Sequence, residues 1–134
     1  MWLRGTKDPF YSGRMCDCRQ ANRVVSLGFN GFPRGIKDLV NRYEDKETKY
    51  LFVAHAERNA LDNAPLSVEG CTLYSPLLPC NECAKSIIQK GITKVVSYEP
   101  TEDRPYLRWD ITKQMFLEAG VQLYLINKTV TPTG

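Results

Sequence analysis

One histidine, one carboxylate and two thiols lie close together in the middle of the chain. His55 is the only histidine in the sequence, and a single alanine separates it from Glu57. Further on, residues 79–83 read Pro-Cys-Asn-Glu-Cys. A histidine nitrogen with two cysteine sulfurs is a ligand set of catalytic zinc, which keeps a fourth position open for water. The sequence therefore predicts that His55, Cys80 and Cys83 bind Zn²⁺.

A Cys-x-x-Cys pair alone also occurs in structural zinc sites and in redox pairs. The catalytic interpretation is favoured because the single histidine lies beside Glu57. Zinc lowers the pKa of a bound water toward about 7, and a neighbouring carboxylate can then move the water's proton to a substrate. We therefore predict Glu57 as the general acid and base.

Two helices are expected to position these groups, over residues 55–63 and 80–90. Cysteines three residues apart lie on one face of a helix, and Pro79 suits the first helical turn. The partial positive charge at a helix N-terminus also favours thiolates there. His55 and Glu57, two residues apart, do not share a face of a regular helix. The first helix must therefore begin near His55, with both side chains turned into a pocket.

The rest of the chain reads as an α/β protein. A further helix is expected over residues 109–119, and residues 37–50 read as a solvated loop or a short helix. Strands and helices alternate in the second half, which implies parallel crossovers in one sheet. The first two strands are joined by a hairpin turn at residues 20–22. The predicted strands are 13–19, 23–29, 71–75, 95–96 and 121–126.

Length and composition indicate an ordinary globular protein. The chain has 134 residues, of which 43% are hydrophobic and 25% charged, enough for one domain over residues 1–134. We find no run of 18 apolar residues and no signal-peptide segment, so neither membrane insertion nor secretion is indicated. The net charge of +3 suits a phosphorylated small molecule better than a long nucleic acid. We expect a cytoplasmic protein with reduced cysteines.

Cys16 and Cys18 lie on one face of the first predicted strand. A second metal site is conceivable there, but no second histidine exists to complete it. Packing within the sheet is the favoured role of both side chains.

A glycine-rich loop over residues 28–35 follows the second strand. It could be a tight turn capped by Asn30. Alternatively, Asn30 and the backbone amides could hold a sugar or a phosphate, with Arg34 nearby. The residues alone favour neither alternative.

A second candidate binding segment spans residues 99–108, after a strand end where open α/β sheets bind ligands. Arg104 and Arg108 could bind a phosphate, and Tyr106 could stack on a base. The alternative is a solvated loop with Trp109 anchored in the core, which is slightly favoured for each residue taken singly.

Taken together, these residues resemble the deoxycytidylate (dCMP) deaminases of the cytidine deaminase-like fold. The H-x-E…P-C-x-x-C pattern is shared by zinc-dependent nucleobase deaminases, and the Gly-Phe-Asn-Gly-Phe-Pro loop points to the deoxycytidylate branch. The matching segments, in chain order, are residues 7–9, 28–35, 49–50, 55–60, 70–74, 79–85, 87–92 and 118–121.

The resemblance implies a three-layer α/β/α fold with a five-stranded mixed sheet and an N-terminal hairpin. We expect the usual first helix to be abbreviated in this chain. It also implies zinc-dependent conversion of dCMP to dUMP and ammonia, which supplies thymidylate synthesis. Asn30 and Asn59 would contact the sugar and phosphate. Members are often homohexamers activated by dCTP and inhibited by dTTP, so Gly28, Asn30, Gly31 and Arg34 are a possible effector loop.

Two other functions stay open at this point. One is deamination of another cytosine substrate, either dCTP or free deoxycytidine. The other is a non-catalytic, zinc-stabilised nucleotide sensor. Glu57 distinguishes an enzyme from the sensor, because a binding module has no need of a carboxylate beside the metal-bound water.

Overall fold

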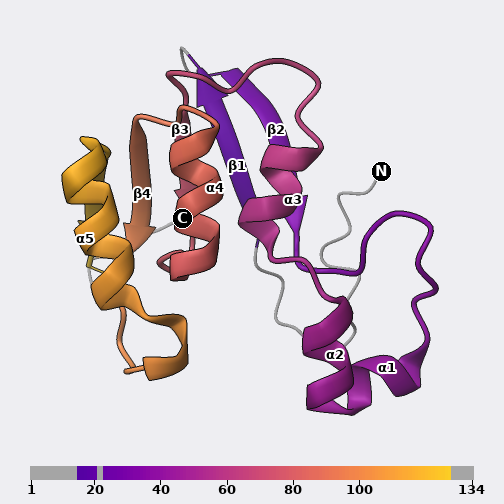
Figure 1. Cartoon of the computed structure of the whole chain (residues 1–134). Helices are drawn as coiled ribbons and strands as arrows, with labels where there is room; N and C mark the ends of the chain where they lie inside the picture. Colours follow the sequence, from indigo (N-terminus) through magenta and orange to yellow (C-terminus); the bar gives the residue numbers. More distant parts are fainter. Residues whose placement is uncertain (1–14, 21–22, 128–134) are drawn as a thin grey trace.

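The chain forms a mixed five-stranded sheet (Figure 1). A computed structural model describes residues 15–20 and 23–127. The strand order is β2-β1-β3-β4-β5, with β1 antiparallel to β2 and to β3 and the last three strands parallel. The strands are β1 (Met15–Gln20), β2 (Arg23–Phe29), β3 (Thr72–Ser75), β4 (Lys94–Tyr98) and β5 (Gln122–Ile126).

The helices follow the sequence pattern closely. The three longer predicted helices are confirmed to within one residue at each end, and residues 37–50 contain one short helix and most of a second. Glycines with a left-handed backbone follow the last two α-helices of the described residues, with φ +82° at Gly91 and +77° at Gly120. The helices are α1 (Val40–Glu44), α2 (Lys46–Phe52), α3 (Ala56–Asp62), α4 (Asn81–Gln89) and α5 (Trp109–Ala119).

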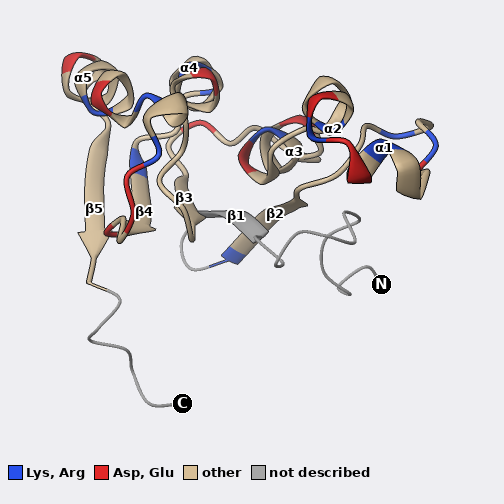
Figure 2. Cartoon of the chain, turned by 90° about the horizontal axis from the view of Figure 1, so that it is seen from below, with Lys and Arg blue, Asp and Glu red and all other residues tan. Residues whose placement is uncertain are grey.

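The helices lie on one side of the sheet, as Figure 2 shows for the described residues. The expectation of a three-layer arrangement is therefore not met in this part of the chain, which forms two layers. The reason lies in the order of the parallel strands. Crossovers between parallel strands are almost always right-handed, and β3, β4 and β5 advance in one direction across the sheet. Successive crossovers in one direction place α4 and α5 on the same face.

The core lies between this helical layer and the sheet. Leu73 and Val95 of the central strands are fully buried, together with Ile87 of α4 and Phe116 of α5. The opposite face of the strands is more open, since Tyr124 is half exposed. No helix among the described residues is long and apolar enough to cross a membrane.

Several expectations concern parts of the chain outside the described residues. These are the abbreviated first helix, the beginning of the first strand at residues 13–14 and most of the hairpin turn. The side chains of Cys16 and Cys18 also lie outside the description, so their role stays a prediction.

Candidate active site

His55 stands at the beginning of α3, as its spacing from Glu57 requires. It is the N-cap residue, with an extended backbone at φ −68° and ψ 155°. The side chain of Asn30 fixes this start, because its Oδ1 accepts a hydrogen bond of 2.8 Å from the backbone N–H of Ala56. The change from extended to helical backbone lets the His55 and Glu57 side chains line the same pocket.

Cys80 is the N-cap residue of α4, so the helix begins at Asn81, one residue later than expected. Its Sγ accepts a hydrogen bond of 3.5 Å from the backbone N–H of Cys83. Pro79 therefore precedes the cap and does not lie in the first turn. Its carbonyl accepts a 2.9 Å hydrogen bond from Thr112 of α5. Trp109 donates a 2.7 Å hydrogen bond to the carbonyl of Leu78, so α5 holds the cysteine loop in place.

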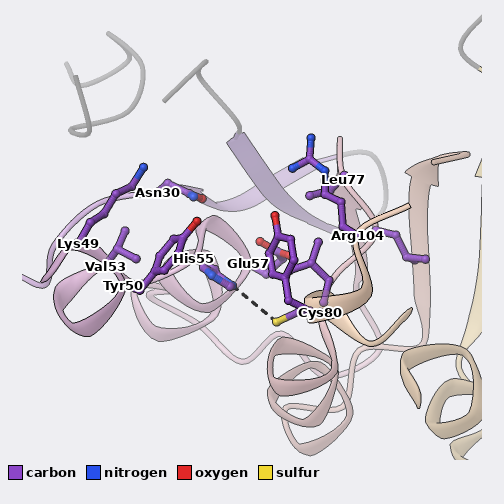
Figure 3. Close-up of a pocket in the computed structure, with 12 residues that line it drawn as sticks. Asn30, Lys49, Tyr50, Val53, His55, Glu57, Leu77, Cys80 and Arg104 are labelled. Carbon is purple, nitrogen blue, oxygen red and sulfur yellow. Dashed lines mark hydrogen bonds between the residues drawn. The ribbon is translucent and has the colours of Figure 1, made fainter. Parts of the chain in front are cut away.

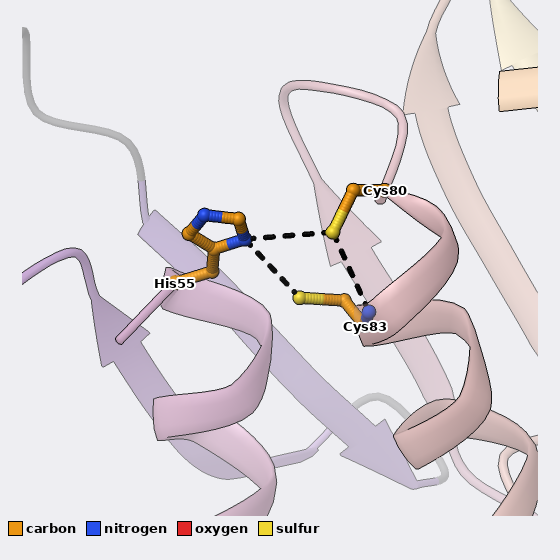
Figure 4. A group of neighbouring side chains, drawn as sticks. All are labelled: His55, Cys80 and Cys83. Carbon is orange, nitrogen blue, oxygen red and sulfur yellow. Dashed lines mark hydrogen bonds between the residues drawn. The ribbon is translucent and has the colours of Figure 1, made fainter. Parts of the chain in front are cut away.

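The three predicted ligands converge (Figure 4). The Nδ1 atom of His55 lies 3.6 Å from Sγ of Cys80 and 3.4 Å from Sγ of Cys83. Tetrahedral zinc, at its usual bond lengths to sulfur and nitrogen, places such atoms about 3.6 Å apart. All three ligand atoms lie within 4.8 Å of one another. The residues present therefore fit a zinc ion, with a fourth position left for water or substrate.

In the absence of metal, hydrogen bonds among the two thiols and the imidazole shift the pKa at which each group holds its proton. The hydrogen bond from the Cys83 thiol lowers the pKa of Cys80, and the contact with His55 lowers it further. The pKa of Cys83 is raised by its hydrogen bond to the Cys80 sulfur and by burial. The pKa of His55 is raised, chiefly by its hydrogen bond with Cys80. Zinc binding must release these protons, because zinc binds thiolates and neutral imidazole.

A pocket opens beside the ligands (Figure 3). Glu57 lines it together with His55 and Cys80 and is only 8% exposed, so its side chain is largely shielded from bulk water. The wall combines aliphatic, aromatic and charged side chains. Its lining residues are Asn30, Lys49, Tyr50, Val53, His55, Glu57, Leu77, Leu78, Cys80, Arg104, Tyr106 and Leu107.

Three of the predicted substrate contacts line this pocket, namely Asn30, Arg104 and Tyr106. Asn30 accepts the backbone hydrogen bond from Ala56 at the start of α3 and also forms part of the pocket wall, and its contact with a ligand stays a prediction. Asn59 does not line the pocket. Its amide Nδ2 donates to the carbonyls of Phe29 at 2.7 Å and Ala54 at 3.4 Å, so it ties the loop to α3.

The other predicted cations, Arg108 and Arg34, are not among the residues that line the pocket. The Arg108 guanidinium makes a bidentate contact with Asp110, at 3.1 and 3.0 Å. Arg34 donates to Oδ1 of Asn63 at 3.1 Å. The function of Arg34 and the glycine-rich loop as an effector site stays a prediction.

The pocket also contains residues that the sequence analysis missed. Lys49 and Tyr50 come from the end of the charged segment, which was expected to be a solvated loop or a short helix, and Val53 lies just beyond it. Helical spacing was the available signal, because positions 49, 50 and 53 lie on one face of a helix.

Residues 16–99 match the family described as the cytidine and deoxycytidylate deaminase zinc-binding region. The chain belongs to the cytidine and deoxycytidylate deaminase family. The zinc ligands of this region are His55, Cys80 and Cys83.

Individual relatives agree with this placement. An uncharacterized deaminase of Aliivibrio fischeri is 44% identical over 107 residues, which are 76% of this chain and 71% of that protein. Human deoxycytidylate deaminase is 44% identical over 97 residues, 68% of this chain but only 54% of the human protein. The dCMP deaminase of cyanophage S-TIM5, solved in complex with dCMP and dUMP, superposes with a TM-score of 0.64 at 26% identity. That superposition covers 86% of this chain and 82% of the phage chain.

Proposed function

We propose that this protein hydrolytically deaminates dCMP to dUMP and ammonia. The observation that carries the proposal is the buried carboxylate of Glu57 in the same pocket as the zinc ligands. A zinc site that only stabilised the fold would not require a buried acid beside it. The proposal extends the family placement to one substrate, and the deoxycytidylate deaminases among the relatives favour that choice.

The chain's own residues account for the proton movements of such a reaction. Zinc, when bound, would lower the pKa of a water toward about 7 and so make a nucleophile available at neutral pH. Glu57 accepts a proton from the water whose oxygen bonds to C4 of cytosine, and it passes this proton to ring N3. It then accepts the remaining proton of the same oxygen and gives it to the amino group, so that the C4–N bond breaks and ammonia leaves.

The wall of the pocket supplies binding and orientation. Leu78, Leu107 and Tyr106 line the pocket. We propose that the two leucines offer apolar surface to the pyrimidine and that Tyr106 stacks on it. The hydrogen bond to Ala56 fixes the orientation of Asn30, which can therefore direct its amide toward the ligand. We propose that Asn30 contacts the sugar.

The first experiment compares Glu57→Gln with the wild-type protein. We expect ammonia release from dCMP to fall at least about a hundredfold, because the proton acceptor is lost while the shape is kept. Zinc content, measured by atomic emission, should stay at the wild-type level. Glu82→Gln is the matched control, since Glu82 lies between the cysteines but is exposed and paired with Lys85.

Three substrates make the experiment decisive. Turnover of dCMP above dCTP and deoxycytidine supports the proposal, whereas faster turnover of either alternative reassigns the substrate. No turnover of any of the three by zinc-loaded protein would refute the deaminase function and support the sensor.

A further inference from the structure

Two cations lie on opposite sides of the pocket. Lys49 comes from α2, and Arg104 comes from the segment between β4 and α5. Figure 3 shows His55 and Glu57 between them. The pocket is therefore negative at its buried acid and positive at two places on its wall, and this separation of charge distinguishes the two ends of a bound nucleotide.

Lys49 belongs to the face of α2 that forms the pocket wall. Tyr50 of α2 and Val53, the C-cap residue that follows the helix, complete this wall. Lys49 is half-buried, whereas Lys46, one turn earlier, is exposed. The side chain of Asp45 caps the helix through the backbone N–H of Thr48, and this cap helps to hold the helix in position.

Arg104 lies across the pocket from Lys49, and its ion pair with Glu102 is weak. Its side chain is 29% exposed, and its Nη2 lies 3.7 Å from a carboxylate oxygen of Glu102, which is itself 70% exposed. Exposed ion pairs of this kind contribute little free energy, so an incoming anion can replace Glu102 at small cost. Arg108 is different, because Asp110 already occupies its guanidinium with two hydrogen bonds.

We propose that Lys49 and Arg104 together bind the phosphate of the nucleotide substrate, and that Lys49 sets the preference for nucleotides over nucleosides. The proposal rests on the deaminase function and names a residue that selects its substrate. A phosphate monoester carries nearly two negative charges at neutral pH, which two cations can match. Glu57 repels that phosphate, so the base and not the phosphate is directed toward the zinc ligands.

The test measures kcat and KM for dCMP and for deoxycytidine, side by side. In Lys49→Gln we expect the KM for dCMP to rise about tenfold with little change in kcat, because binding to a distant phosphate is equal in ground and transition states. The constants for deoxycytidine should change less than about twofold. Arg104→Gln should behave in the same way.

Three comparisons exclude a general structural effect. Lys49→Arg should keep most of the affinity for dCMP that Lys49→Gln loses. Lys46→Gln should leave kcat and KM for both substrates unchanged, because Lys46 does not line the pocket. Raising the salt concentration should raise the KM for dCMP but not the KM for deoxycytidine. With dCTP, a loss in Lys49→Gln equal to that for dCMP would show that the cations bind the phosphate chain without selecting its length.

Several outcomes would overturn the proposal. An equal loss of kcat/KM for dCMP and for deoxycytidine in Lys49→Gln would make Lys49 a structural residue. If kcat/KM changed for neither substrate, the phosphate would bind elsewhere. If the wild-type protein deaminated neither compound, the deaminase function would fail separately. Calorimetric binding of dCMP and deoxycytidine to wild-type and Lys49→Gln protein would then still decide whether Lys49 binds phosphate.

Discussion

Cys80 combines two functions in one sulfur atom. It belongs to the zinc ligand group, and it accepts the backbone hydrogen bond that starts α4. A negatively charged sulfur is stabilised there by the helix N-terminus and by the hydrogen bond from Cys83. This double role explains why the helix starts at Asn81 and why both sulfurs reach the same imidazole.

The environment of Cys80 predicts selective alkylation. In the metal-free protein at about pH 6.5, iodoacetamide should modify Cys80 well before Cys71, because thiolates react and thiols do not. The pKa of Cys80 is lowered and that of Cys71 is raised by burial. Peptide mass spectrometry gives the extent of labelling at each position.

Zinc loading provides the control for this prediction. Bound metal should protect Cys80, and removal of the metal should restore its reactivity. Labelling of Cys71 as fast as Cys80 in the metal-free protein would contradict the predicted difference in pKa.

At the scale of elements, the close contact between α3 and β2 decides where His55 and Glu57 lie. Gly28 permits it. A Cβ atom at this position would lie 2.2 Å from the carbonyl oxygen of Ala56 and 2.3 Å from the nitrogen of Ala60. Both atoms belong to the backbone of α3, so the clash cannot be relieved by a side-chain rotation. The adjacent hydrogen bond from Ser26 to the carbonyl of Ala60, 2.6 Å long, fixes the same contact.

We therefore expect Gly28→Ala to destabilise the fold by at least about 3 kcal/mol, because α3 must move away from the sheet. Urea unfolding measures this loss. Zinc affinity should fall as well, since His55 moves with the helix.

Gly35→Ala is the matched control. Gly35 has a left-handed backbone at φ +85° but no atom within 4 Å of an added Cβ. Its substitution should cost only about 1 kcal/mol. Equal costs at the two positions would show that the contact with α3 is not the constraint.

At the scale of the whole molecule, the metal site connects two separate parts of the helical layer. His55 lies at the start of α3, and the two cysteines lie at the start of α4, with β3 between them in the chain. A ligand that binds only the folded arrangement stabilises it by mass action. Bound zinc would therefore connect the starts of α3 and α4 and stabilise the folded arrangement.

Zinc removal should lower the melting temperature by at least about 5 °C, and added zinc should restore it. Differential scanning calorimetry with and without a chelator measures the change. Cys83→Ala is the control, because a protein that lacks this ligand should melt at a temperature that the chelator does not alter. An unchanged melting temperature in the wild-type protein would contradict a connecting role.

The sequence by itself determined the chemistry of this protein. The zinc ligands, the acid beside them and the three longer helices follow from residue types and local spacing, which depend on backbone geometry within a few residues. Local spacing also required the helix to begin near His55, and the structure confirms this start.

Tertiary structure alone decided which residues share the pocket. Lys49 enters it from α2, while Asn59 and Arg108 are used in contacts elsewhere. It also decided that the described helices cover one face of the sheet. These outcomes depend on how distant segments pack and on which hydrogen-bond partner each polar group has in the folded structure. Spacing along the chain contains neither kind of information.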